Sequence, residues 1–292
     1  MPPQLIFFYT YNCGGLADMI KGMSTVWWLA KMSNREFAIR FKHEIGLLYS
    51  GLLGNLKPDM PVINLIDKKS SDNILELLNG QFAEKDIAIL CNGGLDHFKK
   101  YENYLENIRP FFNKFYREIL PIGLLEEKEE EPFQVLHCRM GDVYLKEATN
   151  KMDNRIGGQD ILQIRLGIFL KQFAGGSGGG GSGGGSIRTL ICCDNKEILD
   201  LLLKVVPNSF SVCRNPYHFA YNTRVIGQQE IMKSIRETMA EHEQMSRASR
   251  IIMLAYSGFP IISALIGNVS ELLIIDETVE KGWKHYKNDW TI

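Results

Sequence analysis

Short apolar runs bounded by turn residues alternate along this chain with longer segments whose apolar residues recur at helical spacing. The short runs predict buried strands at residues 5–9, 36–41, 86–91, 134–137, 189–193, 209–213 and 271–276. The longer segments predict helices, among them 16–27, 101–120, 159–173, 196–205, 228–245, 261–266 and a short terminal one at 282–290. Strands that alternate with helices are typical of α/β folds built on parallel sheets.

The spacing of apolar residues also predicts which face of a helix is buried. In the segment 159–173 it predicts a buried stripe of Ile161, Ile164, Ile168 and Phe169. In the segment 228–245 the predicted stripe is Ile231, Ile235 and Met239.

Two segments interrupt this alternation. Residues 126–131 are five Glu and one Lys, followed by Pro132, which is typical of a solvated connection. We therefore predict two domains, 1–125 and 126–292. Residues 175–186 contain only Gly and Ser, the composition of an engineered flexible linker that replaces a natural loop. This linker stands between a predicted helix and a predicted strand, so it marks no domain boundary.

Composition narrows the class of protein. The 292 residues suffice for two domains, and 45% hydrophobic with 23% charged residues is typical of a globular protein. Lys and Arg number 33 against 34 Asp and Glu, without a basic run, so we expect no nucleic-acid partner. We see no signal peptide and no apolar run of the roughly 18 residues that a membrane span needs. The six Cys lie mostly in apolar runs and predict reduced thiols, so we expect a cytoplasmic protein.

Candidate chemistry stands at the ends of predicted strands. The strand 134–137 runs into His137, Arg139 and Asp142. An Arg beside a Gly-containing turn at the carboxyl end of a strand can hold a phosphate with its planar fork, and ligands of open α/β sheets bind at that edge. An equally weighted alternative is that Arg139 and Asp142 form a surface ion pair.

Three other turns offer similar chemistry. Gly14-Gly15 follows the first predicted strand and lets backbone N–H groups approach a phosphate or sugar, although an ordinary βα turn explains it too. Asp194 follows the strand 189–193, where it either contacts a ligand or caps the next helix. Ser257 opens a helix and either binds an anion there or acts only as its N-cap.

The run His137-Cys138-Arg139-Met140-Gly141-Asp142 resembles the His-x-Arg-x-x-Asp motif of the fucosyltransferase superfamily. This resemblance implies that Arg139 binds the β-phosphate of a sugar nucleotide and that His137 lies beside the nucleotide. The α-1,6 branch carries a catalytic Glu ten residues after the motif His, which is Glu147 here. Glu147 is therefore our first candidate for the general base, with Asp142 and Asp18 behind it.

Two more segments support the resemblance, in family order. Residues 14–23 resemble the Gly-rich first turn of the family, and residues 245–260 resemble its helix end, strand and Ser/Phe turn. The Asp at the end of strand 189–193 lies near the nucleotide in the family. The resemblance thus implies a cleft lined by Gly14, Gly15, Asp18, Asp194, Tyr256, Ser257, Gly258 and Phe259.

Together these matches imply an α/β protein of the GT-B class, with two Rossmann-like domains facing a central cleft. The domain 1–125 would lie on the acceptor side, and the domain 126–292 would bind the nucleotide sugar on the donor side. The implied activity is inverting transfer of a sugar from a sugar nucleotide to a hydroxyl of a glycan acceptor. The chain has no Asp-x-Asp pair, which agrees with a metal-independent reaction without a cofactor. The alternative of a different class is a catalytically silent protein that binds a glycan or a nucleotide on the same fold.

The donor is less well defined. Where the α-1,6 branch has a guanine-reading Asp, this chain has Cys213-Arg214-Asn215, so Arg214 becomes the candidate for base contact. A short chain that lacks both a membrane anchor and the guanine-reading Asp resembles the large-virus branch of the superfamily. That branch includes chlorella-virus enzymes that use UDP-xylose. We therefore expect UDP-xylose as donor, with GDP-fucose as the alternative.

Overall fold

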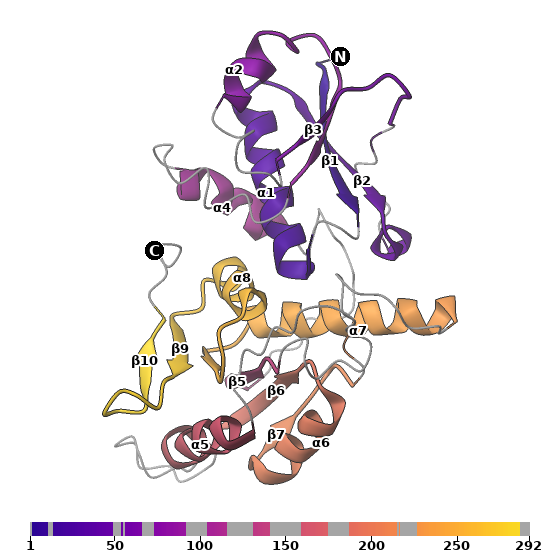
Figure 1. The fold of residues 1–292 in the computed structure, drawn as a ribbon. Helices are drawn as coiled ribbons and strands as arrows, with labels where there is room; N and C mark the ends of the chain where they lie inside the picture. Colours follow the sequence, from indigo (N-terminus) through magenta and orange to yellow (C-terminus); the bar gives the residue numbers. More distant parts are fainter. Residues whose placement is uncertain are drawn as a thin grey trace. The chain divides into compact units, whose positions relative to one another are not determined.

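The computed structural model describes residues 2–10, 14–48, 54, 56–65, 73–91, 104–115, 131–140, 159–174, 187–214, 216 and 227–286. Contacts divide the chain into two compact units: unit 1 is Met1–Ile122 with Phe219–Asn222, and unit 2 is Gly123–His218 with Thr223–Ile292. Each unit contains a sheet flanked by helices (Figure 1). The predicted roles of an acceptor-side domain 1–125 and a donor-side domain 126–292 stay predictions.

Unit 1 is built on a parallel sheet whose strands pair in the order β2-β1-β4-β3. These strands are β1 (Gln4–Thr10), β2 (Glu36–Lys42), β3 (Val62–Asn64) and β4 (Ile87–Leu90). The helical segments are α1 (Leu16–Met32), the 3₁₀ turn η2 (Glu44–Leu48), α2 (Ile74–Asn79) and α4 (Tyr104–Lys114). Helix α1 packs on α4 through the rings of Trp27 and Phe111, whose centroids are 5.8 Å apart.

Unit 2 is built on a larger sheet with the strand order β10-β9-β8-β5-β6-β7, in which β10 is antiparallel to β9 and the other pairs are parallel. The strands are β5 (Phe133–Cys138), β6 (Arg188–Cys193), β7 (Ser209–Phe210), β8 (Arg250–Met253), β9 (Glu271–Ile275) and β10 (Trp283–His285). The helices are α5 (Gln159–Phe169), which continues into the π-helical turn η6 (Leu170–Ala174), α6 (Lys196–Val205), α7 (Gln228–Ser246) and α8 (Gly258–Gly267).

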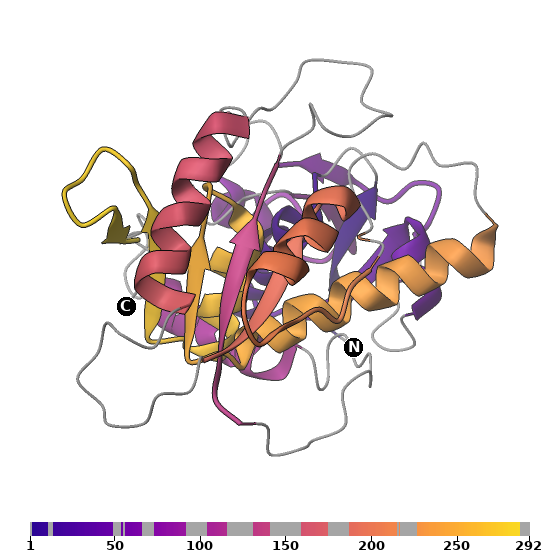
Figure 2. The ribbon, with the colours of Figure 1, turned by 90° about the horizontal axis from the view of Figure 1, so that it is seen from below.

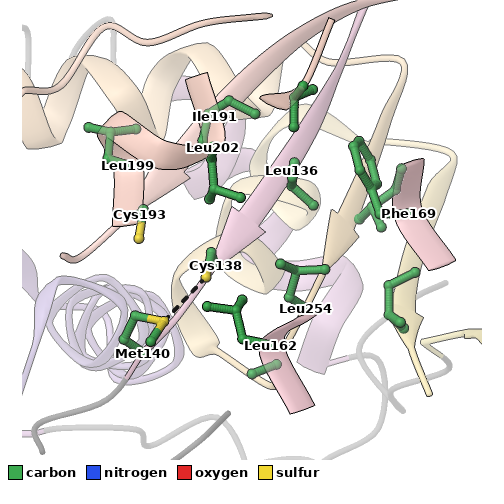
Figure 3. Packing of buried hydrophobic residues seen from close by; sticks show 14 of the residues in the cluster. Leu136, Cys138, Met140, Leu162, Phe169, Ile191, Cys193, Leu199, Leu202 and Leu254 are labelled. Atoms are coloured by element: carbon green, nitrogen blue, oxygen red, sulfur yellow. Dashed lines mark hydrogen bonds between the residues drawn. The ribbon is translucent and has the colours of Figure 1, made fainter. Parts of the chain in front are cut away.

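The two faces of this sheet are covered by different helices because side chains alternate along each strand. Leu136 and Cys138 of β5 pack under α5 and α6, in the cluster drawn in Figure 3. Phe133 and Val135 face the opposite way and pack against α7 and α8. Figure 2 views unit 2 from the side of α5 and α6, with the strands behind them. The central strands β5, β6 and β8 are thus buried on both faces, which explains their continuous apolar runs in the sequence.

The buried side-chain amide of Gln134 contacts residues on both sides of the Gly/Ser linker. The side-chain Nε2 of Gln134 donates to the Phe173 carbonyl at 3.1 Å and contacts the Thr189 hydroxyl, also at 3.1 Å. Phe173 lies in η6 and Thr189 in β6, so the described residues on the two sides of 175–186 meet at this amide. Both ends lie near the amino edge of the parallel strands, because Gln134 and Thr189 are register partners near the start of β5 and β6.

The structure corrects three details of the sequence reading. Residues 283–285 form the edge strand β10, where a helix at 282–290 was predicted, because the positive φ of Gly282 (74°) turns the chain back onto β9. Strand β7 is shorter than predicted. Helix α5 is rotated relative to its predicted stripe: Leu162 and Phe169 are buried, whereas Ile164 is 49% exposed.

No helix in the part of the chain that the structure describes is long and apolar enough to cross a membrane.

Candidate functional site

The strand order of unit 2 creates a topological switch point beside β5. From β5 the chain moves outward through β6 to β7, and then crosses to β8 on the other side of β5 and continues to β9. Ligands of open α/β sheets bind at the carboxyl ends of the strands at such a point. The two strand ends are joined there, because the Leu254 N–H donates to the His137 carbonyl at 2.9 Å. Arg139 follows β5 and Ser257 follows β8, so the structure brings these two predicted residues to the switch point.

Arg139 is held in an ion pair with Asp194. Its Nη1 lies 2.7 Å from Oδ2 of Asp194, and the Met140 N–H donates to the other carboxylate oxygen at 2.8 Å. The side chains of Arg139 and Asp194 are 18% and 15% exposed. Asp194 therefore orients both the guanidinium and the backbone that follow β5, while leaving the guanidinium accessible to solvent.

This pair bears on two alternatives that the sequence left open. Among the described residues Arg139 pairs with Asp194, which follows the neighbouring strand β6, and the alternative pairing with Asp142 lies outside the described residues. The N-cap of α6 is Asn195, whose side chain accepts from the Ile198 N–H at 3.0 Å. The suggestion that Asp194 caps this helix was therefore wrong, because its carboxylate is directed to Arg139.

His137 is buried at the end of β5 and is neutral at physiological pH. Burial, with smaller contributions from the charges of Arg139 and His242, lowers its pKa to about 3. Its Nδ1 is buried and has no hydrogen-bond partner among the described residues. Its ring lies 6.1 Å from that of Phe259, centroid to centroid. A neutral imidazole adds no charge for a phosphate, so the cation at this strand end is Arg139.

The turn after β8 presents the start of α8. Ser257 is the N-cap, and its hydroxyl accepts from the Phe259 N–H at 3.4 Å. Tyr256 is 49% exposed, Ser257 is buried, and Gly258 and Phe259 are partly buried. The first N–H groups of a helix have no partner within the helix and, with its dipole, favour an anion. A phosphate at the switch point would therefore meet Arg139 from β5 and this helix end from β8.

Helix α7 supports the start of α8 from inside the unit. The ring of His242 lies 4.6 Å from that of Phe259 in an edge arrangement, and the Ser263 hydroxyl donates to the His242 carbonyl at 3.0 Å. Burial lowers the pKa of His242 to about 3, so this imidazole is also neutral. His242 was not predicted as a site residue from the sequence. The pattern that could have identified it is the helical spacing of polar residues on the buried face of α7, where Thr238 is one turn before His242.

Glu241 is a second buried polar residue of α7 that was not predicted from the sequence. It is buried against β6, and one of its carboxylate oxygens, Oε1, has no hydrogen-bond partner among the described residues. Burial, with the nearby charges of Asp194 and Glu237, holds the pKa of this carboxyl well above its usual range, against a hydrogen bond with Cys192 that lowers it. Burial inside unit 2 therefore favours the protonated, neutral form of Glu241.

The predicted glycine turn of unit 1 forms the start of α1. Gly14 has a φ of 87°, where a side chain is strained, and its carbonyl accepts from the Tyr9 hydroxyl at 2.8 Å. Gly15 is the N-cap of α1, and its N–H donates to the Asp18 carboxylate at 3.4 Å. Asp18 also pairs with Lys21 at 2.8 Å. Asp18 therefore has a structural function at this helix end, whatever else it contacts.

Three predicted residues remain, namely Asp142, Glu147 and Arg214. Asp142 and Glu147 fall outside the described residues. Arg214 follows β7 and is exposed, with Nη1 at 3.9 Å from Asp200. Its backbone N–H donates at 3.2 Å to the carboxylate of Glu237, a residue of α7. This contact brings a carboxylate beside the segment in which the sequence lacks an Asp.

No group of three or more His, Cys, Asp or Glu that could hold a metal ion occurs among the residues with described positions. The expected metal independence stays a prediction.

No protein-family model and no curated protein matches this sequence. Solved structures do match it along its whole length. The NodZ alpha-1,6-fucosyltransferase soaked with GDP-fucose has a TM-score of 0.57 and 13% identity, over 99% of this chain and 100% of that chain. The selenomethionine form of the fucosyltransferase NodZ from Bradyrhizobium gives 0.58 and 12%, over 99% of each chain. At such identities the likeness shows the fold alone, and the predicted GT-B fold is confirmed.

Proposed function

We propose that this chain is a glycosyltransferase that moves a sugar from a nucleotide diphosphate to a hydroxyl of a glycan acceptor without a metal ion. The observation that carries the proposal is that Arg139 and the start of α8 follow two neighbouring parallel strands, β5 and β8, at the switch point of unit 2. The likeness to NodZ, solved with GDP-fucose, supports the same chemistry. A fold alone does not define a reaction, so the proposal is carried by the residues of the site, Arg139 and the start of α8.

The site supplies what the departure of a nucleotide diphosphate requires. Negative charge builds up on the leaving phosphates as the sugar–oxygen bond breaks, and preorganised donors stabilise it. Arg139 provides a charge that Asp194 holds in place. The start of α8 provides the Gly258 N–H and the positive end of the helix dipole, since the Phe259 N–H donates to Ser257 and Pro260 has no N–H. In this proposal His137 is a neutral neighbour of the nucleotide, consistent with its lowered pKa.

The second requirement is a base for the acceptor proton. The resemblance to the α-1,6 branch makes Glu147 our proposed base, with Asp142 as the next candidate. Asp18 is the third, because its carboxylate already accepts from Gly15 and pairs with Lys21. Loss of either contact would destabilise the start of α1. If Asp18 acted as the base, these contacts would therefore be weakened.

We now favour GDP-fucose over UDP-xylose as the donor. The expectation of UDP-xylose depended on the absence of an Asp near Cys213, yet Glu237 brings a carboxylate beside Arg214. Guanine presents two adjacent N–H donors that a carboxylate recognises, whereas uracil presents one N–H between two carbonyls. Glu237 Oε2 accepts from the Arg214 N–H and has a second lone pair for such a donor. NodZ has also been solved with GDP, with a TM-score of 0.55 to this chain.

The test is a titration of the protein with GDP, UDP, GDP-fucose and UDP-xylose by calorimetry, followed by an assay of donor hydrolysis and transfer with EDTA present. We expect GDP to bind more tightly than UDP, and sugar release without added metal. Tighter binding of UDP would reverse the choice of donor. Tight binding of a donor without turnover over a broad panel of acceptors would favour the silent binding protein instead.

A further inference from the structure

Arg165 of α5 joins two loops at the carboxyl edge of the unit 2 sheet. Its Nε donates to Oε2 of Glu277 at 2.6 Å and its Nη2 to Oε1 at 3.2 Å, so the carboxylate is held by both. Its Nη1 donates to the carbonyl of Leu254 at 2.7 Å. Glu277 follows β9 and Leu254 follows β8. One guanidinium of α5 therefore connects the segments that follow two neighbouring strands, β8 and β9.

Leu254 is fixed on both of its backbone groups. Its N–H donates to the His137 carbonyl at 2.9 Å, and its C=O accepts from Arg165. The side chain of Leu254 is fully buried in the cluster under α5 and α6 (Figure 3). The peptide groups on either side of Leu254 thus have little freedom to rotate.

Leu254 lies between the two parts of the proposed phosphate site, Arg139 and the start of α8. Along β5, its partner His137 is two residues before Arg139. Along the other strand, Leu254 is three residues before Ser257, the N-cap of α8. The position of the helix end relative to Arg139 therefore depends on how Leu254 is held.

We propose that Arg165 is a positioning residue that sets the distance between the Ser257 turn and Arg139, and so determines how tightly the terminal phosphate of the donor is bound. The inference rests on the proposed function. Arg165 itself touches none of the donor-binding candidates, and the resemblance to the fucosyltransferase motif gives it no role. Glu277 is its necessary partner, because it holds the guanidinium plane that aims Nη1 at Leu254.

The chemistry requires an Arg at this position. A guanidinium donates along several fixed directions in one plane, so it serves a carboxylate and a carbonyl at once. The single ammonium of a Lys is a point charge on a flexible stem and would keep the attraction to Glu277 while losing the fixed geometry. Arg165→Lys thus separates positioning from charge, and Glu277→Gln loosens the same contact with a nearly unchanged shape.

The experiment compares the affinities for GDP and GMP, because their ratio isolates the terminal phosphate. Calorimetry would be done on the full chain at a temperature where circular dichroism shows every variant folded. The variants are Arg165→Lys, Glu277→Gln, Arg139→Lys as the direct phosphate contact, and Arg250→Lys as the matched control. Arg250 starts β8 at the opposite edge of the sheet and lies 3.9 Å from Glu271, so it shares the strand and the residue type.

We expect Arg165→Lys to lower the GDP-to-GMP affinity ratio by roughly tenfold, the size of one charge-assisted hydrogen bond, with GMP affinity unchanged. Glu277→Gln should lower it less, and Arg250→Lys should leave it as in the wild type. A residue that only stabilised the fold would lower the melting temperature and leave the ratio unchanged, which would overturn the inference. A ratio that falls in Arg139→Lys alone overturns it too. A wild-type protein that binds neither nucleotide overturns the proposed function first.

Discussion

Glu241→Gln is expected to change how the stability of the protein depends on pH. Glu241 is buried on α7, and its carboxyl has a pKa well above the ordinary value of 4.5 because it is desolvated. The native state therefore keeps the proton at pH values where the unfolded chain has lost it. Such a group contributes stability that is fully present below pH 4.5 and is lost as the pH rises toward the native pKa.

The size of the effect follows from proton linkage. While the pH lies between the unfolded and the native pKa of this carboxyl, each pH unit lowers the free energy of unfolding by about 1.4 kcal/mol. Gln has nearly the same shape and no proton to lose. The wild type should therefore lose stability relative to Glu241→Gln as the pH rises above 4.5, by about 1.4 kcal/mol per pH unit until the native pKa is reached.

Other buried groups affect both proteins alike. His137 and His242 have their pKa lowered to about 3, so the stability they contribute is present above pH 6.5 and is lost as the pH falls toward 3. This loss opposes the slope from Glu241 below pH 6.5, and it cancels in the difference between the two proteins. The difference is therefore the quantity to measure.

The assay is urea unfolding followed by circular dichroism at pH 5, 6, 7 and 8. Glu230→Gln, at the exposed start of α7, serves as the control for the removal of a surface charge from the same helix. A stability difference between wild type and Glu241→Gln that stays constant across this range would refute the reasoning. The same holds if the difference grows toward low pH.

Three further predictions concern the site and the packing of unit 2. Arg139→Lys should lose turnover strongly while the protein stays folded, because the charge remains and the fork is lost; wild-type activity in Arg139→Ala would contradict this. Glu147→Gln should lower turnover by roughly 10²–10⁴-fold with donor affinity little changed, and normal turnover, with loss in Asp142→Asn or Asp18→Asn, would move the base. Gly267→Ala should destabilise unit 2 strongly, since its Cβ would lie 1.6 Å from the Ser246 carbonyl oxygen, and an unchanged melting temperature would be evidence against this close packing.

The sequence predicted the parts of the fold that depend on local pattern. Buried strands such as β5 and β6 read as continuous apolar runs, and Ser257 was identified as the residue that opens α8. The rotation of α5 was missed because Ile164 fits the apolar period as well as Leu162 does, and only packing against the sheet decides between them.

Contacts between distant residues could not be predicted in the same way. Arg139 and Asp194 are 55 positions apart, and they meet only because β5 and β6 are register neighbours. Arg165 and Glu277 are 112 positions apart, and their contact requires both the α5 rotation and the end of β9. Strand order is a property of the whole unit, so a single sequence read along its length gives the participants but not the pairs.

The amide of Gln134 has a practical consequence for protein engineering. It fixes Phe173 and Thr189, which flank the Gly/Ser segment, so native contacts already bring the two ends of that segment together. Both attachment points lie at the amino edge of the strands, whereas Arg139 and Ser257 lie at the carboxyl edge. A reporter or an affinity domain inserted between 175 and 186 would thus be anchored at the edge of the sheet opposite to the proposed donor site, and the protein could be displayed or immobilised there with that site accessible.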